Sequence, residues 1–312
     1  MSLETEIQNI IKDIPVSFGI AIKNLCSGEE VLLNVDRPFQ LANAFKIPIL
    51  VAAIQQIDRG RFHLNDRIVL HDFHKVYPND ILSAMEDGAR LPIKDLLSLM
   101  ISSSDSTAID MTLDLIGGPN AVNTSMRKLG FTSDEIRIMT SVHGKLEEVF
   151  GFSEAYLNTS EMVKTVMSEG IYINGGNNHD GSKVNTATPR AINRLNEMIF
   201  HGNIASHSLC KDAVAILLQQ ALNTRLQPDF ESDDSPVDIT QNIGMLFGVQ
   251  NDSGIIKVRD NVFLAVTIFS KQEWRFEYDK IVSPSFEELE RQADNAIRKI
   301  TKRAYEYWKE QL

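Results

Sequence analysis

Hydrophobic positions along this chain pass from an alternating period to a helical one and back again. A short amphipathic stretch at residues 4–12 is followed by alternating runs at residues 16–23 and 29–35. The segment between these runs, residues 24–28, has the composition of a turn, so the sequence predicts a β-hairpin. Apolar residues then follow a helical spacing that ends before Gly60, namely Ile47, Leu50, Val51, Ile54 and Ile57.

The centre of the chain is predicted to be mostly helical. Candidate helices cover residues 91–101, 107–116, 121–129, 160–168, 189–201 and 206–222, whereas the Gly- and Asn-rich segment 170–182 is predicted to be an exposed loop.

Strand patterns return near the C-terminus, at residues 239–249, 254–258 and 262–270. Ser285 has the features of an N-cap, with Glu288 three residues later, and predicts a terminal helix. This order indicates an α/β (α+β) fold, in which an antiparallel sheet is flanked by terminal helices and an all-helical lobe is inserted. We expect residues 1–42 and 206–312 to form the sheet lobe and residues 43–205 the helical lobe of one domain.

Composition narrows the functional classes. The 312 residues carry a formal charge of −11 and include two cysteines, Cys26 and Cys210. An acidic chain is a poor non-specific nucleic-acid or membrane-surface binder, and no apolar run reaches the length of a membrane span. We therefore expect no nucleic-acid partner, no membrane insertion and no disulfide framework. The first residues lack the features of a signal peptide, which predicts a cytoplasmic protein or one whose signal has been removed.

Three short segments carry the candidate chemistry. The first contains Asn43-Ala44-Phe45-Lys46, the second contains Ser104-Asp105-Ser106, and the third contains Asn242-Ile243-Gly244-Met245. Their order resembles the class A β-lactamases and the wider penicillin-recognising serine hydrolases, which use Ser-x-x-Lys, Ser-Asp-Asn and Lys-Thr-Gly motifs. The segments at residues 115–123 and 186–190 are also similar to the framework of that family. The resemblance covers nearly the whole chain and implies a β-lactamase/transpeptidase-like fold.

The first motif departs from the family at its nucleophile. Asn43 occupies the position of the attacking serine, and a carboxamide nitrogen is a very poor nucleophile. In the family, Lys46 would belong to the proton-transfer network. Here, with no serine to activate, the favoured interpretation is a buried ammonium satisfied by Ser104, Ser106 or Asn43. Loss of the serine in one well-studied protease lowers the rate by about 10⁶-fold, so the resemblance implies impaired acyl-serine chemistry.

The second motif keeps Ser104, which the resemblance implies is a proton shuttle. We expect Asp105 to bind backbone groups of its own loop. The resemblance places both Asp105 and Ser106 in the substrate-binding region. In the third motif, Asn242 and Ile243 replace the Lys and Thr that help to hold the substrate carboxylate, and Gly244 remains. Ser253 stands where many relatives carry an arginine, and Lys257 and Arg259 could substitute for it only in part.

Two further family features remain open. Glu154, in the segment Glu154-Ala155-Tyr156-Leu157-Asn158, fits the pattern of the deacylating carboxylate, although its spacing from the second motif is long. The backbone N–H groups of Asn43 and Met245 would form the oxyanion hole, which survives side-chain replacement.

Metal and cofactor signals are weak. His71 and His74 lie three residues apart without a third ligand in range, so we expect no metal site there. The chain also lacks a Gly-rich phosphate loop, so no cofactor is predicted.

Three hypotheses follow. The first is a binding or regulatory pseudoenzyme with a small-molecule ligand and an unknown protein partner. The second is an active hydrolase of a β-lactam or another amide or ester, with Ser104 as nucleophile and Lys46 as base. In that case Ser102, Ser103 and Ser106 are lesser candidates, and Lys46 could also act through its own amine. The third is a helical scaffold with an interaction surface and a vestigial pocket.

Overall fold

A computed structural model provides the structure of this chain. It describes residues 1–76, 80–144, 184–220, 226, 239–246, 249–272, 276–277, 280–281 and 286–311. The predicted helix at 160–168 and the predicted loop at 170–182 lie outside the described residues.

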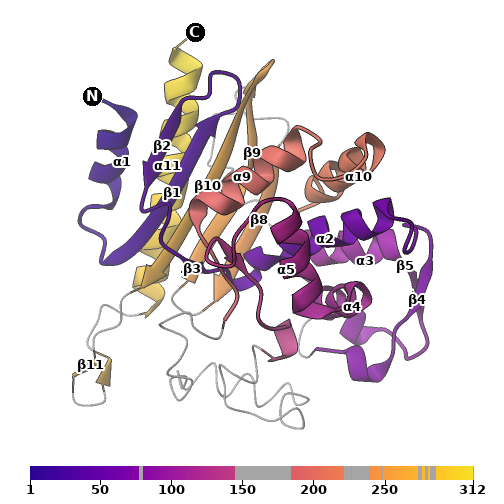
Figure 1. Cartoon of the computed structure of the whole chain (residues 1–312). Coiled ribbons are helices and arrows are strands. Elements are labelled where there is room, and N and C mark those ends of the chain that lie inside the picture. The colour runs from indigo at the N-terminus through magenta and orange to yellow at the C-terminus, as the bar shows by residue number, and fades with distance from the viewer. Residues whose placement is uncertain are drawn as a thin grey trace.

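A five-stranded antiparallel sheet forms the centre of the fold, and both ends of the chain contribute to it (Figure 1). Its strand order is β2-β1-β10-β9-β8. The strands are β1 (Val16–Asn24), β2 (Glu30–Leu33), β8 (Ile239–Leu246), β9 (Val249–Arg259) and β10 (Val262–Gln272). Each neighbouring pair is antiparallel. The N-terminal hairpin and the last long strand therefore share one sheet, which confirms the antiparallel α/β fold class.

The two faces of the sheet are covered by different helices. The N-terminal helix α1 (Leu3–Ile11) and the C-terminal helix α11 (Phe286–Glu310) pack together on one face (Figure 1). Alternate strand residues such as Ile20 and Leu264 enter the core under these helices, together with Trp308. Helix α9 (Pro189–Phe200) packs against β1, β9 and β10. Because successive strand residues point to opposite faces, β1 supplies side chains to both layers.

The remaining helices surround α2 (Lys46–Asp58), whose residues from Lys46 to Ile57 are all buried. These helices are α3 (Ile93–Ser102), α4 (Ser106–Ile116), α5 (Gly118–Lys128) and α10 (His207–Leu217). Each of the four packs against α2. A helix buried all round needs mostly apolar residues, as α2 has between Ile47 and Ile54. Its buried polar residues Lys46, Gln55 and Gln56 each have a hydrogen-bond partner.

Short elements complete the described fold. They are the strands β3 (Phe39–Gln40), β4 (Arg67–Val69), β5 (Arg90–Pro92), β6 (Ile136–Arg137), β7 (Thr186–Ala187), β11 (Phe276–Glu277) and β12 (Lys280–Ile281), and the 3₁₀ helices η1 (Ala42–Phe45), η2 (Asp72–His74) and η3 (Leu82–Ala84).

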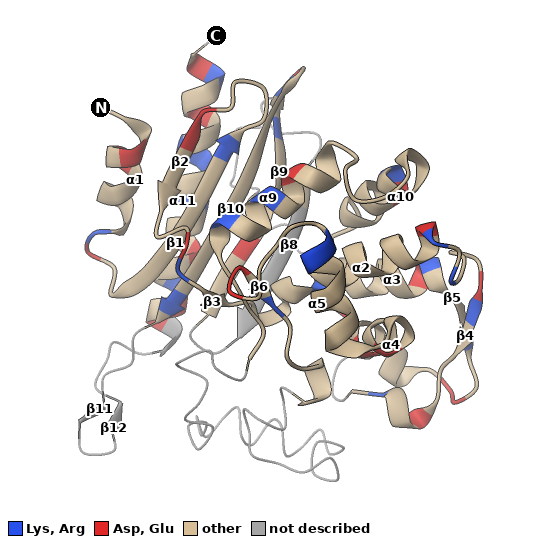
Figure 2. Cartoon of the chain, viewed as in Figure 1, with Lys and Arg blue, Asp and Glu red and all other residues tan. Residues whose placement is uncertain are grey.

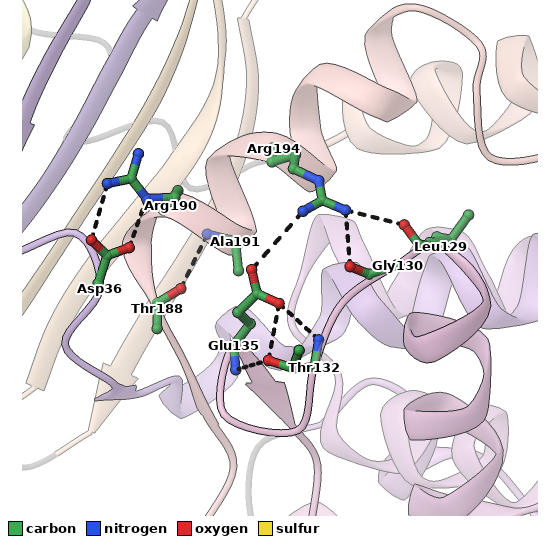
Figure 3. A network of polar contacts seen from close by, with 9 residues as sticks. All are labelled: Asp36, Leu129, Gly130, Thr132, Glu135, Thr188, Arg190, Ala191 and Arg194. Atoms are coloured by element: carbon green, nitrogen blue, oxygen red, sulfur yellow. Dashed lines mark hydrogen bonds and ion pairs between the residues drawn. The ribbon is translucent and has the colours of Figure 1, made fainter.

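Polar contacts fix helix α9 at its N-terminal end and near its middle (Figure 3). Arg190 makes a bidentate pair with Asp36, at 2.6 and 3.0 Å. Arg194 donates to the carbonyls of Leu129 and Gly130, at 3.2 and 3.1 Å. These contacts join the helix to the chain before β3 and to the end of α5, so α9 is a fixed wall between the sheet and the helices.

Two predictions about the late strands were wrong in their limits. The run at 239–249 is not one strand, because β8 ends at Leu246 and β9 begins at Val249. The polar residues 250–253, which the sequence analysis left outside any strand, belong to β9 and are buried. A hydropathy pattern misses such a strand because it expects buried residues to be apolar. The lobe limits at residues 43 and 206 stay a prediction.

Charged residues of both signs occur on α11 and around β4 and β5, whereas the charged residues of α1 are Glu4 and Glu6, both acidic (Figure 2). Of the helices in the described ranges, none combines the length and the apolar character that a membrane span requires.

Gly19 allows side chains from two other segments to lie directly on β1. A Cβ at this position would stand 2.4 Å from Cε2 of Phe39 and 2.7 Å from Cγ of Pro189. Both groups are rigid, so the neighbouring elements would have to move.

We therefore predict that Gly19→Ala lowers the free energy of unfolding by about 1–3 kcal/mol, as measured by urea denaturation. Ser17→Ala, two residues earlier on the same strand face, is the matched control and should change stability by less than about 0.5 kcal/mol. Equal stability of the two variants would contradict this packing.

Candidate functional site

Asn43 lies in the short helix η1, which leads into α2. Ala42, just before it, has a left-handed φ of 47°. The N–H of Leu41 donates to the carbonyl of Asn185 at 2.8 Å, which fixes the entry to this turn. Strained backbone of this kind is concentrated at functional positions. The Asn43 side chain is half-buried, in contrast to its fully buried neighbours Ala42 and Ala44.

Lys46, the first residue of α2, is fully buried. Its Nζ donates to Oγ of Ser104 at 2.6 Å. Burial lowers the pKa of Lys46 from 10.5 to about 7, and the nearby carboxylate of Asp252 opposes that shift. A large fraction of this amine is therefore neutral near neutral pH, when it can accept a proton as well as donate one.

The loop between α3 and α4 places Ser104 against Lys46. Ser104 has a left-handed φ of 55°. Asp105 caps α4, because its Oδ1 accepts from the N–H of Ala108 at 2.8 Å. Its Oδ2 accepts from the N–H of Leu82 in η3 at 2.9 Å. Both Asp105 oxygens thus bind backbone groups, which is the role that the sequence analysis expected. Ser106, the first residue of α4, is half-buried.

A second carboxylate, Asp80, supports the same loop and was missed by the sequence analysis. Its Oδ2 accepts from the N–H of Thr107 at 2.9 Å and from the Thr107 hydroxyl at 3.2 Å. Burial, with a further contribution from the charge of Asp105, raises the pKa of Asp80 to about 6. Its only signal in the sequence was an acidic residue in a turn-like segment, which is too common to mark a site.

Strand β8 carries the third motif beside the first. β8 packs against η1, so the backbone of Asn242 to Met245 lies next to the Asn43 turn. Across the ladder, Ile243 pairs with Asp252 and Gly244 pairs with Asn251. The structure therefore brings Asn43, Lys46, Ser104 and the third-motif backbone into one region. Glu154 lies outside the described residues, as do the side chains of residues 242–245.

The polar segment of β9 is the main feature that sequence reasoning missed. Asn251, Asp252 and Ser253 are all fully buried. The Asn251 Nδ2 donates to the carbonyl of Gln40 at 2.7 Å, and its Oδ1 accepts from the N–H of Ser270 at 3.1 Å. Asn251 thus ties β9 and β10 to the chain just before η1. Four successive polar residues between apolar strand residues were the available signal.

Lys257 and Arg259 do not take part in this region. Lys257 pairs with Asp260 at 3.3 Å near the end of the β9–β10 hairpin, and Arg259 is exposed. This arrangement fits the interpretation of both side chains as strand charges.

The chemistry available in this region is proton exchange between a buried amine and a hydroxyl. Asn43 supplies no nucleophile, and Ser104 is the hydroxyl in contact with the amine. Within the described ranges, no group of three or more His, Cys, Asp or Glu side chains is arranged to hold a metal ion. The Nδ1 of His74 accepts from the N–H of His71 at 3.1 Å, so this pair is engaged locally.

Comparison with known sequences agrees with this arrangement. The model of the beta-lactamase enzyme family matches residues 2–308. The chain is 24% identical over 292 residues to the beta-lactamase regulatory protein BlaB of Streptomyces cacaoi, covering 87% of this chain and 90% of that protein. It is 27% identical over 132 residues to the extended-spectrum beta-lactamase PER-1 of Pseudomonas aeruginosa. That second match spans 41% of this chain and 42% of the relative.

Comparison with solved structures gives the same fold. The crystal structure of a beta-lactamase from Sphaerobacter thermophilus superposes with a TM-score of 0.70 at 24% identity, over 97% of this chain and 94% of that one. A family match over almost the full length, together with the geometry of the three motifs, leads to one conclusion. This chain belongs to the beta-lactamase enzyme family.

Proposed function

We propose that this protein is a binding or regulatory member of the family that forms no acyl-enzyme. The observation that carries the proposal is Asn43 at the nucleophile position, next to a Lys46 whose Nζ is already bound to Ser104 at 2.6 Å. A carboxamide cannot replace the serine in acyl transfer. Lys46 already has a hydrogen-bond partner in Ser104, so its contact does not require a serine at residue 43.

The third motif supports the same proposal. Asn242 and Ile243 replace the cation and the hydroxyl that the family uses to hold a carboxylate. A buried carboxylate without a cation or donor has an unfavourable free energy. The similarity to a relative named as a regulatory protein also favours a role in regulation.

The proposed ligand is a small molecule with a carbonyl group. The backbone N–H groups of Asn43 and Met245 are the proposed donors to that carbonyl, with Ser106, Asn242 and Gly244 around it. Asp105 would act by positioning the loop, since both of its oxygens bind backbone N–H groups. A deacylating role for Glu154 is not required in this proposal.

A second candidate function rests on the contact between Lys46 and Ser104. A hydroxyl 2.6 Å from an amine whose pKa is about 7 is arranged as in a Ser-Lys dyad. Ser104 would attack an amide or ester and Lys46 would take its proton. The weakness of this candidate is the oxyanion hole, which in the family is built around position 43 rather than around Ser104.

We predict that the unmodified protein gains no mass when incubated with a penicillin, as measured by intact-protein mass spectrometry. Asn43→Ser alone should restore little acylation, because the substrate carboxylate would still be poorly held. Adding Asn242→Lys and Ile243→Thr should increase acylation, since these groups also orient the reacting carbonyl. A covalent adduct on the unmodified protein would contradict the proposal.

The second candidate predicts a different result with a chromogenic cephalosporin and a panel of activated esters. Our proposal predicts no turnover above background in any of these assays. The exposed Ser103 provides a matched control for the half-buried Ser104. Steady hydrolysis that Ser104→Ala abolishes and Ser103→Ala preserves would establish the Ser-Lys dyad.

The protonation state of Lys46 predicts a stability change with pH. The folded-state pKa of about 7 lies below the ordinary value of 10.5, so between these values the unfolded state binds more protons. The free energy of unfolding should therefore rise with pH in this window. We expect a rise of about 1–3 kcal/mol between about pH 7 and about pH 9, relative to Lys46→Met. Lys94→Met, at an exposed lysine of α3, is the control and should keep the wild-type pH dependence.

A further inference from the structure

A separate cavity lies on the sheet face that α9 covers. It has a volume of about 280 Å³ and lies between α9, the end of α10, and strands β8, β9 and β10. Its lining includes Phe200, Leu217, Ile255 and Phe263. The Phe200 and Phe263 rings lie 4.8 Å apart between centroids, so they form an aromatic wall. Among the lining residues that the structure describes, none belongs to the three motifs of the candidate site.

Two polar groups interrupt the apolar lining, and both can donate a hydrogen bond. Asn196 is 3% exposed, and its Nδ2 has no hydrogen-bond partner among the described residues. The Thr240 Oγ1 accepts from the N–H of Ile255 at 2.9 Å, which leaves the hydroxyl hydrogen able to donate. A buried donor without an acceptor raises the free energy of the folded state, and a ligand acceptor would remove that penalty.

The cavity has the size and chemistry of a small-ligand site. An apolar cavity of about 150 Å³ is large enough to bind benzene, and ligand pockets begin at about 300 Å³. No described lining side chain is charged, so a charged ligand would be desolvated without a counter-ion. The matching ligand is uncharged and apolar, and carries one hydrogen-bond acceptor.

We propose that this cavity is a binding site for neutral aromatic molecules that bear a carbonyl acceptor. The ring packs against Phe200, Phe263 and Leu217, and the carbonyl oxygen accepts from Asn196. The polar contacts of Arg190 and Arg194 hold α9 in place, so the cavity wall is formed before the ligand binds. This site does not depend on the proposed function, because it needs neither β-lactam recognition nor Lys46.

The test uses two probes with the same number of non-hydrogen atoms. Acetophenone carries the carbonyl oxygen, and isopropylbenzene has a methyl group in its place. Binding to the full chain is measured by ligand-observed NMR titration. We expect acetophenone to bind saturably with a dissociation constant on the order of 1 mM or below. Isopropylbenzene should bind about three- to tenfold more weakly, because it cannot accept the hydrogen bond.

Two variants separate the hydrogen bond from the cavity. Asn196→Leu keeps a side chain of similar size and should remove the preference for acetophenone, so that both probes bind equally. Val214→Phe, at a half-buried lining residue of α10, fills the cavity and should abolish binding of both probes. It also keeps the test decisive if Asn196→Leu does not fold. Phe73→Ala, at a residue that is 76% exposed and absent from the lining, is the control and should bind both probes normally.

The proposal is overturned by any of three results. These are the absence of saturable acetophenone binding to the folded wild-type protein, unchanged binding in Val214→Phe, or the same preference for acetophenone in Asn196→Leu as in the wild type.

Discussion

The buried amine of Lys46 is the constraint on which the candidate site depends. Moving a charged amine out of water has a free-energy cost of several kcal/mol unless partners compensate for it. Here the partners come from two distant segments, the Ser104 loop between α3 and α4 and the Asp252 position on β9. Lys46 thus joins the first turn of α2 to the loop and to the sheet. The contact between Lys46 and Ser104 therefore has a structural role that does not require catalysis.

Buried polar groups continue this arrangement through β9. Asn251 links the carbonyl of Gln40 to the N–H of Ser270. Asp105 and Asp80 hold the backbone around the Ser104 loop in a similar way. Each of these side chains satisfies backbone groups that would otherwise be unpaired in a water-excluded region. The geometry of the region is therefore set in part by side chains outside the three motifs, namely Asn251 and Asp80, and it does not need a serine at position 43.

Strand β8 connects the candidate site to the cavity beneath α9. Thr240 lines the cavity, and two residues later the same strand reaches Asn242, where it runs beside η1. A displacement of β8 on ligand binding would therefore move both Thr240 in the cavity and Asn242 in the third motif. If ligands bind at both places, any coupling free energy between the two proposed sites would be reciprocal.

The sequence by itself determined the fold class and showed which motif residues differ from those of the family. Alternating and helical periods were enough for the hairpin, α2 and the terminal helix, because those elements bury apolar faces with a regular spacing. The replacement of the nucleophile by Asn43 was also readable directly. Tertiary structure alone decided which partner satisfies Lys46, because Ser104, Ser106 and Asn43 were equal candidates until their distances were known. It also revealed Asp252, Asn251, Asp80 and the cavity at Asn196, since burial of a polar group depends on contacts between segments far apart in the chain.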